Sequence, residues 1–298
     1  MKLVIDDLTT QTRIDSYLAD YMQDFSRSKI QNEIKNGAVS VNSKLVKPSY
    51  LLKEGDVVEF VPSKPPKILP ENIPLEIVWE DENMLVVNKP SGMLTHPTTV
   101  EMSGTLVNAL LYKYSENLSD LNGDFRRGIL HRLDRNTSGL LMAAKNNAAH
   151  EYLVEAMKAH KMTKKYLAVV KGVIAEDSFT IDKPIGRSPS NPLKMGVVEG
   201  GKEAVSIIKV LERFEDATLA EVQLITGRTH QIRVHLSSIG HPVYNDTLYG
   251  FGKMKIKTEE QVLESYKLTF PRPFDGGLIS LEIEPDEKVS KVLKTLRN

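Results

Sequence analysis

Hydrophobic and polar positions alternate in two different ways in the first part of the chain. Apolar residues recur at helical spacing over residues 14–21 and again over residues 30–34, where Ser26 can cap the second helix. Residues 39–41 and the segment VVEFV then show the two-residue period of strands. The pattern predicts two short helices followed by a small sheet.

A proline-rich stretch, VPSKPPKILPENIP, interrupts these patterns. Proline removes backbone donors and favours extended, semi-rigid conformations. We therefore expect a linker at residues 63–74, between a small α+β domain at 1–62 and a larger domain at 75–298.

The larger domain alternates apolar strand-like segments with helical ones. LEIVWEDENMLVVNKPSG predicts two strands around a turn, and further strands are predicted at GLLMAAK, KYLAVVKGV, AVSIIKVLERF, TLAEVQLI and GGLISLEIEP. Helices are predicted at SGTLVNALLYKYS, at AAHEYLVEAMKAH and, with an apolar stripe, at the C-terminus. This is the pattern of an α+β fold with a mixed, largely antiparallel sheet flanked by helices.

Composition narrows the classes of function. The chain has no cysteine, and Lys and Arg number 39, as do Asp and Glu. It contains no run of about 18 apolar residues, so we expect a soluble cytoplasmic protein with no membrane span. Binding to nucleic acid would depend on local basic patches: residues 27–47 carry a net charge of +4 and residues 126–171 a net charge of +7. Either run can also be an ordinary solvated surface.

One carboxylate, Asp134, stands among four arginines in RRGILHRLDRNTSGLLMAAK. Nearby cations favour the ionised carboxylate, which is the form needed for nucleophilic attack or general base catalysis. Asp134 could equally be a structural tether to an arginine in a turn.

HRLDRNTSG resembles the signature of the RluA-type (RluD-like) family of pseudouridine synthases. Further segments of that family occur here in its order: NKPSGMLTHP, KKY, PIGR and GRTHQIRVHLSSIGHPVYND. The resemblance covers nearly all of residues 75–270. Residues 12–60 resemble the small alpha-L RNA-binding module of a small-subunit ribosomal protein and several RNA-modifying enzymes.

The family resemblance implies roles for three residues. Asp134 would be the nucleophile or its equivalent. Tyr166 would stack on the target base and serve in the final proton removal, and Arg233 would pair with Asp134 and keep it ionised. Without the resemblance, Tyr166 would be interpreted as a core tyrosine and Arg233 as an arginine on a helix surface.

Two groups of polar side chains are candidate RNA contacts. Around the expected site, the phosphate or base of a flipped nucleotide would meet His131, Arg132, Arg135 and Arg228. In the N-terminal module, phosphates would meet Arg27, Lys29, Lys35 and Lys44.

Pseudouridine formation needs neither a redox change nor a group donor, so we expect no cofactor. We expect no metal either, because His230 and His235 lie five residues apart with no Glu between them, unlike the zinc helix motif. The expected partner is structured RNA. Relatives with this module most often resemble enzymes of large-subunit ribosomal RNA, and transfer RNA is the alternative. We expect a monomer.

Two other classes of function stay open. The chain could be an inactive ribosome assembly factor, although retention of Asp134, Tyr166 and Arg233 together argues against this. A uracil C5 methyltransferase is disfavoured, because such enzymes typically use a cysteine and a glycine-rich methyl-donor loop.

The chain departs from the family at two places. His241-Pro242 is followed by Asn245-Asp246, where the family usually has Gly-Asp. Asn tolerates the left-handed backbone conformation, so we expect the turn to be retained. The segment QVLESYKLTFPRPF lacks a histidine that is common in the family, which concerns local packing and not the expected catalytic residues.

Overall fold

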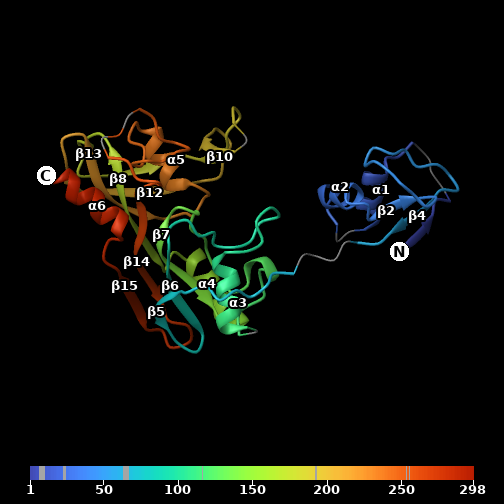
Figure 1. Cartoon of the computed structure of the whole chain (residues 1–298), viewed down its shortest axis with the longest axis horizontal. Helices are drawn as coiled ribbons and strands as arrows, with labels where there is room; N and C mark the ends of the chain where they lie inside the picture. The colour runs from blue at the N-terminus through green and yellow to red at the C-terminus, as the bar shows by residue number, and fades with distance from the viewer. Residues whose placement is uncertain are drawn as a thin grey trace. The chain divides into compact units, whose positions relative to one another are not determined.

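The chain forms two compact units, Met1–Lys67 and Ile68–Asn298, in the computed structural model (Figure 1). The structure describes residues 1–6, 11–22, 25–62, 67–115, 117–191, 193–252, 254 and 256–298.

The first unit packs two helices on a small sheet. Its elements are α1 (Ile14–Tyr21), α2 (Arg27–Lys35), β1 (Lys2–Val4), β2 (Val39–Val41), β3 (Lys44–Leu45) and β4 (Val57–Phe60). The strand order is β1-β4-β2-β3. The apolar stripes of both helices are buried against Val39, Val58 and Phe60. The predicted helices and sheet are confirmed, whereas β1 was not predicted from the sequence.

The second unit is built on one large sheet. Its strands are β5 (Glu76–Glu80), β6 (Met84–Lys89), β7 (Ser138–Ala144), β8 (Thr163–Lys171), β9 (Ser178–Asp182), β12 (Val205–Arg213), β13 (Ala217–Leu224), β14 (Leu263–Pro271) and β15 (Leu278–Glu282). They follow the order β5-β6-β7-β14-β8-β13-β12-β9, with β15 paired to β14. Only β7 and β14 pair in parallel among these described strands, which confirms the predicted mixed, largely antiparallel sheet.

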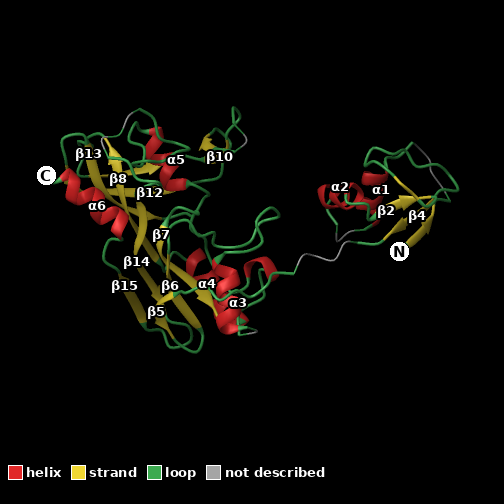
Figure 2. Cartoon of the chain, viewed as in Figure 1, coloured by secondary structure: helices red, strands yellow, loops and turns green. Residues whose placement is uncertain are grey.

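Helices cover both faces of this sheet (Figure 2). They are α3 (Leu106–Tyr114), α4 (Asn147–Lys158), α5 (Gln231–Ser238) and α6 (Glu287–Leu296), and a separate ribbon is formed by β10 (Ile185–Arg187) and β11 (Met195–Val197). Successive side chains of a strand face opposite sides. Leu141 of β7 therefore packs in the core that includes α3 and α5, and Met142 in the core that includes α4.

Strand β14 was not predicted, although it lies between β7 and β8 at the centre of the sheet. Its pairing with β7 aligns Ser265 with Gly139. Gly139 has φ +108°, and a Cβ at this position would meet the Ser265 backbone. Glycine is therefore required for the two strands to approach here.

The predicted linker extends too far towards the C-terminus. Its residues 63–66 lie outside the described part of the chain, but Ile68 is buried in the main core of the second unit. The Asn108 side chain donates to Leu69 O at 2.8 Å, and Glu71 N–H donates to Asn108 O at 3.0 Å. An apolar anchor and these bonds attach the segment to α3.

Candidate active site

Asp134 lies in the loop that leads into β7, and hydrogen bonds hold the backbone of this loop before and after it. Thr95 Oγ1 donates to Leu133 O at 2.9 Å and accepts from Leu133 N–H at 3.2 Å. Thr137 N–H donates to Asp134 O at 3.2 Å, which closes a turn. The carboxylate is thereby presented from an ordered loop.

Lys89 supports the same loop from the end of β6. Its buried ammonium donates to the carbonyls of Pro90 and Met93, each at 2.8 Å, and of Arg135 at 3.0 Å. Burial and the nearby Lys288 ammonium lower the pKa of Lys89 to about 7, although Asp134 and Glu260 act in the opposite direction. Three carbonyl acceptors satisfy the three donors of the ammonium form.

Arg233 of α5 joins two carboxylates. Its Nη1 donates to Asp134 Oδ2 at 2.9 Å, while its Nε and Nη2 donate to the two oxygens of Asp246 at 2.7 and 2.9 Å. The Arg233 side chain is 7% exposed and that of Asp134 is 17% exposed. The bidentate bond to Asp246 fixes the plane of the guanidinium and so the direction from which it meets Asp134. Arg233 is not on the helix surface.

The pairing of Arg233 with Asp246 shifts the pKa values of both groups. Burial by itself would lower the pKa of Arg233, but bonds to Asp246 and Asp134 raise it above its usual value. Burial would likewise raise the pKa of Asp246, but Arg233 and the backbone N–H groups of Tyr249 and Leu248 lower it overall. A permanently charged guanidinium therefore faces Asp134.

Tyr166 of β8 is 5% exposed and lies on the sheet face that carries α5. Burial, followed by the negative charge of Asp134, raises the pKa of its phenol above the usual value, although a bond to Ser265 acts the other way. The phenol is thus protonated at neutral pH. This supports the expected role as an aromatic platform for a base more than the role of a proton acceptor.

A pocket brings these groups together. Asp134, Tyr166 and Arg233 line it with Arg132, Arg228 and His230. Arg132 is exposed at its edge, and Arg228 Nε donates to Glu203 O at 2.8 Å. Both arginines therefore lie at the pocket, and their contact with RNA stays a prediction.

Two of the expected RNA contacts point elsewhere. His131 Nε2 accepts the backbone N–H of Met142 at 3.1 Å, and burial lowers its pKa to about 3, so the ring is a neutral support for β7. Arg135 donates to both carboxylate oxygens of Glu101 at 3.0 and 2.5 Å and does not line the pocket. Both are neighbours of Asp134 in sequence, but the turn directs their side chains away from it.

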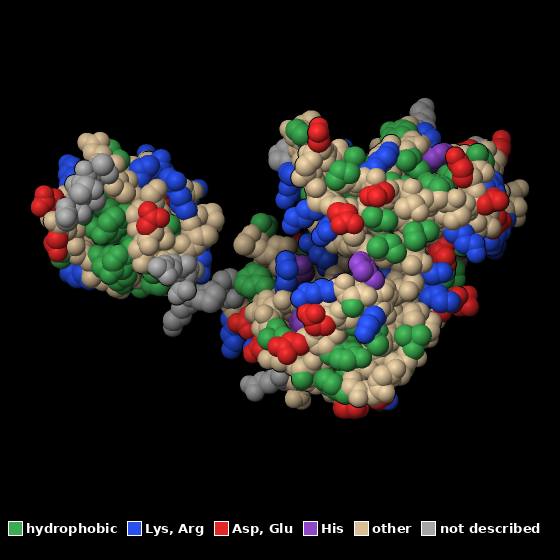
Figure 3. All heavy atoms as spheres, turned by 180° about the vertical axis from the view of Figure 1, so that it is seen from behind, with side chains coloured by type: hydrophobic (Ala, Val, Ile, Leu, Met, Phe, Trp, Pro, Cys, Tyr) green, Lys and Arg blue, Asp and Glu red, His purple; other side chains and the backbone are tan. Residues whose placement is uncertain are grey.

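The cations of the N-terminal unit also differ from one another. Arg27 bonds to the buried carboxylate of Asp15 at 3.3 and 3.4 Å, so it has a structural partner. Lys29 lies 4.0 Å from the centre of the Phe25 ring. Lys35 and Lys44 are exposed. Figure 3 shows Lys and Arg side chains on the surface of this unit and around a hollow of the second unit.

The histidines considered for a metal occupy different hydrogen-bond networks. His235 bonds through Nδ1 to Ser206 Oγ at 2.9 Å and through Nε2 to Lys183 O at 3.0 Å. His131 is used by Met142, as described above. The described residues contain no group of three or more His, Asp or Glu side chains arranged to hold a metal ion.

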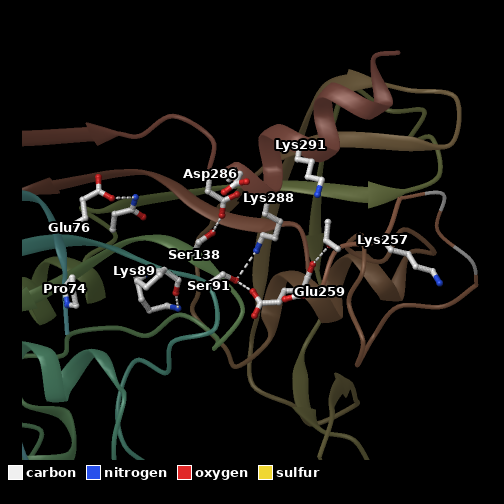
Figure 4. Close-up of a pocket in the computed structure, with 15 residues that line it drawn as sticks. Pro74, Glu76, Lys89, Ser91, Ser138, Lys257, Glu259, Asp286, Lys288 and Lys291 are labelled. Carbon is white, nitrogen blue, oxygen red and sulfur yellow. Dashed lines mark hydrogen bonds between the residues drawn. The ribbon is translucent and has the colours of Figure 1, made fainter. Parts of the chain in front are cut away.

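A second, larger hollow of about 850 Å³ lies beside the same loop. Lys288 donates to Ser91 Oγ at 3.2 Å, and Ser138 Oγ donates to Asp286 at 2.5 Å (Figure 4). Lys288 also donates to Asn136 O at 3.3 Å. Acidic and basic side chains alternate around this hollow, so it has no single charge preference. Two of its lining side chains, Ser91 and Lys288, donate to Asn136 O and so hold the loop that carries Asp134.

The fold and this site define an RNA pseudouridine synthase. The RNA pseudouridylate synthase family matches residues 83–238, and the S4 domain family matches residues 12–58. The chain belongs to the RNA pseudouridine synthase family and carries an N-terminal S4 domain, which confirms the resemblance to RluA-type enzymes.

Similar proteins match the chain over nearly its whole length. It is 45% identical over 287 residues to "Uncharacterized RNA pseudouridine synthase YlyB" of Bacillus subtilis, covering 96% of this chain and 94% of that one. It is 39% identical to "Ribosomal large subunit pseudouridine synthase D" of Zymomonas mobilis, covering 95% and 93%. The solved structure of human RNA Pseudouridylate Synthase Domain Containing 1 matches with a TM-score of 0.57 and 25% identity, covering 79% of this chain and 98% of that one.

In the described part of the chain, no helix has the length and apolar character needed to cross a membrane.

Residue-by-residue sequence reasoning missed Asp246, Tyr249 and Thr95 as parts of the site. Asp246 and Thr95 fall inside segments that carry the family resemblance, which was the signal that could have found them. Their roles depend on contacts over 13 and 38 residues of sequence, respectively, which no local pattern reports. The turn at Asn245 is retained as predicted, with φ +56°.

Proposed function

We propose that the protein isomerises specific uridines of large-subunit ribosomal RNA to pseudouridine, with Asp134 as the catalytic carboxylate and without a cofactor. The observation that carries the proposal is the pocket in which Arg233 meets Asp134 at 2.9 Å beside the buried ring of Tyr166.

The reaction breaks the bond between uracil N1 and ribose C1′ and forms a bond between C5 and C1′. The proton on C5 is lost and N1 gains one, so the product is an isomer. Asp134 can attack C1′, attack the uracil ring or remove a ribose proton, and each route needs an ionised carboxylate. Arg233 holds the carboxylate by a charge-assisted hydrogen bond of 2.9 Å.

The detached base must stay in the pocket while it turns over. The buried ring of Tyr166 offers a face for stacking. Its phenol is protonated, so it places no second negative charge beside Asp134. Arg132 and Arg228 at the pocket are positioned to bind phosphates of a nucleotide flipped out of its helix.

The choice of ribosomal RNA rests on relatives and on the S4 domain. Curated relatives from Zymomonas mobilis and Pseudomonas aeruginosa, at 39% and 42% identity, are named for the ribosomal large subunit. Transfer RNA is the second candidate substrate. That the enzyme acts as a cytoplasmic monomer stays a prediction.

Pseudouridine mapping of total RNA tests substrate and nucleophile together. Cells lacking the protein would be complemented with the wild type or with Asp134→Asn, which keeps the size of the side chain and removes its charge. We expect defined sites in large-subunit RNA to disappear and to be restored by the wild type only.

The result also decides against the alternatives. If sites vanish from transfer RNA alone, transfer RNA replaces large-subunit ribosomal RNA as the proposed substrate. Restoration by Asp134→Asn would remove Asp134 from the mechanism. If no site changes in a strain without a redundant enzyme, the inactive assembly factor becomes the better description.

A further inference from the structure

His230 reaches the same pocket from the residue that precedes α5. Its Nε2 lies 3.9 Å from Asp134 Oδ1, beyond hydrogen-bonding distance, and its ring is only partly buried. Two groups of the pocket at this distance can both reach one ligand atom that lies to the side of the line between them, at about 2.8 Å from each.

The hydrogen bonds around Tyr249 favour one tautomer of the neutral His230 ring. Tyr249 Oη accepts the backbone N–H of Met195 at 2.9 Å and lies 2.8 Å from His230 Nδ1. With one acceptor position of Oη occupied, the arrangement favours donation of the phenol hydrogen to Nδ1. The neutral tautomer favoured in this way carries its proton on Nε2, the nitrogen nearer to Asp134.

The neutral form is also the one favoured electrostatically. Burial lowers the pKa of His230, and Arg233 and Arg132 lower it further, whereas Asp134 and Asp246 raise it. The overall shift is downward. At neutral pH, His230 is thus an uncharged donor whose direction is set by Tyr249.

The backbone at His230 is in the left-handed region, at φ +57°, where non-glycine residues are uncommon. The side chain makes no capping bond to α5, so helix capping does not explain why histidine occupies this position. The conformation instead directs the imidazole into the pocket.

We propose that His230 is a substrate-contacting residue whose Nε2–H donates a hydrogen bond to an oxygen of the target nucleoside bound against Asp134. The acceptor is a uracil carbonyl or the ribose 2′-hydroxyl. Tyr249 is the positioning residue that holds the imidazole in the required tautomer. The inference rests on the proposed function, because it takes the pocket around Asp134 as the place of the target uridine.

The test uses the full-length protein and an RNA that contains a mapped target uridine. His230→Gly removes the imidazole and fits the left-handed backbone, so it separates the contact from backbone strain. His160→Gly is the matched control, because His160 is also left-handed, at φ +52°, but is exposed at the end of α4. Single-turnover rates, RNA affinity and melting temperature are measured for each.

We expect His230→Gly to lower the single-turnover rate by about 10-fold, the size of one hydrogen bond. Tyr249→Phe should give a smaller decrease, and the double variant should be no slower than His230→Gly alone. His160→Gly should match the wild type in rate and affinity.

Modified target nucleotides identify the acceptor. Three RNAs each carry one modified nucleotide at the target position. 2′-Deoxyuridine removes the 2′-hydroxyl, and 2-thiouridine or 4-thiouridine replaces one uracil carbonyl oxygen by sulfur, which is a weaker acceptor. The wild type should lose rate or affinity with one of these RNAs, and His230→Gly should lose nothing further with the same RNA. A purely structural role of His230 cannot produce this coupling.

Wild-type rate and affinity for His230→Gly would overturn the proposal. The proposal would also be overturned if each of the three modified RNAs changed the rate and affinity of the wild type and of His230→Gly to the same extent. An active Asp134→Asn variant is a different outcome, because it would refute the proposed nucleophile while leaving the hydrogen bond of His230 measurable.

Discussion

Arg233 bonds to two carboxylates through different edges of its guanidinium group. A lysine cannot reproduce this geometry, since its ammonium is a point charge on a flexible stem. We expect Arg233→Lys to lower the single-turnover rate by about 100-fold or more, in the range found when a positioned charge is removed from an active site. Rapid-quench measurement of pseudouridine formation at saturating enzyme would report it.

Asp246→Asn is the matched variant, because it leaves the bond from Arg233 to Asp134 in place and weakens only the support behind it. Its rate should fall less than that of Arg233→Lys. An Arg233→Lys enzyme as fast as the wild type would show that the orientation of the guanidinium is unimportant.

Glu264 provides a prediction of pH dependence at the same scale. Glu264 is fully buried and pairs with Ser138 across β14 and β7. Burial and the negative charge of Asp286 raise the pKa of its carboxyl to about 7, although a hydrogen bond from the backbone N–H of Asp286 and the Lys288 charge act in the opposite direction. The stability that the protonated group provides is fully present below its unfolded pKa of about 4.5 and is lost as pH rises from there through about 7.

Glu264→Gln should remove this decrease, because the amide is neutral at every pH and can still accept from Asp286 N–H. We expect its free energy of unfolding to exceed that of the wild type at pH 8 by as much as about 3 kcal/mol, and by far less at pH 5. Urea unfolding at the two pH values measures the difference. A constant difference between the two proteins across this range would contradict the assignment.

At the level of elements, the parallel pairing of β7 with β14 fixes where the loop that carries Asp134 ends. Gly139 makes this pairing possible, because its φ is +108° and it has no Cβ to meet the Ser265 backbone. Asp134 lies five residues before Gly139, and Tyr166 pairs with Ser265 across β8 and β14. The two catalytic candidates are therefore brought together by one strand.

Gly139→Ala should destabilise the protein by about 3 kcal/mol or more, because it adds both backbone strain and a clash in the centre of the sheet. Differential scanning calorimetry would show the lowered melting temperature. Gly123→Ala is a suitable control, since Gly123 also has a positive φ, of +72°, but a Cβ there meets nothing within 4 Å. A similar effect of the two changes would mean that strain and not the strand contact is decisive.

At the scale of the whole molecule, we expect the S4 unit and the synthase unit to carry different parts of RNA recognition. The exposed cations Lys29, Lys35 and Lys44 of the S4 unit are suited to phosphates, which carry no sequence information. Replacing all three by alanine should weaken binding to different RNAs to a similar extent. The slope of log affinity against log salt should flatten by about 0.7–0.9 for each phosphate that the lysines no longer neutralise.

Arg27→Ala is the informative control in this unit, because Arg27 is paired with Asp15. It should lower the melting temperature of the unit and change the salt slope little. If Arg27→Ala flattens the slope as much as the triple change does, its pairing with Asp15 does not prevent an RNA contact.

The sequence by itself determined most elements and the identity of the main catalytic candidates. The periods of 3.6 and 2 residues report which side chains face the core, so α1, α2, α4, α6 and most long strands were predicted correctly. The family segments identified Asp134, Tyr166 and Arg233, which the structure brings into one pocket.

Only the tertiary structure decided the direction of side chains and the order of strands. It placed β14 at the centre of the sheet, turned His131 and Arg135 away from the pocket, set Asp246 behind Arg233 and brought His230 to the pocket wall. The physical reason is that local periodicity records burial but not partners. The pairing of β7 with β14, for example, joins segments that lie more than 100 residues apart.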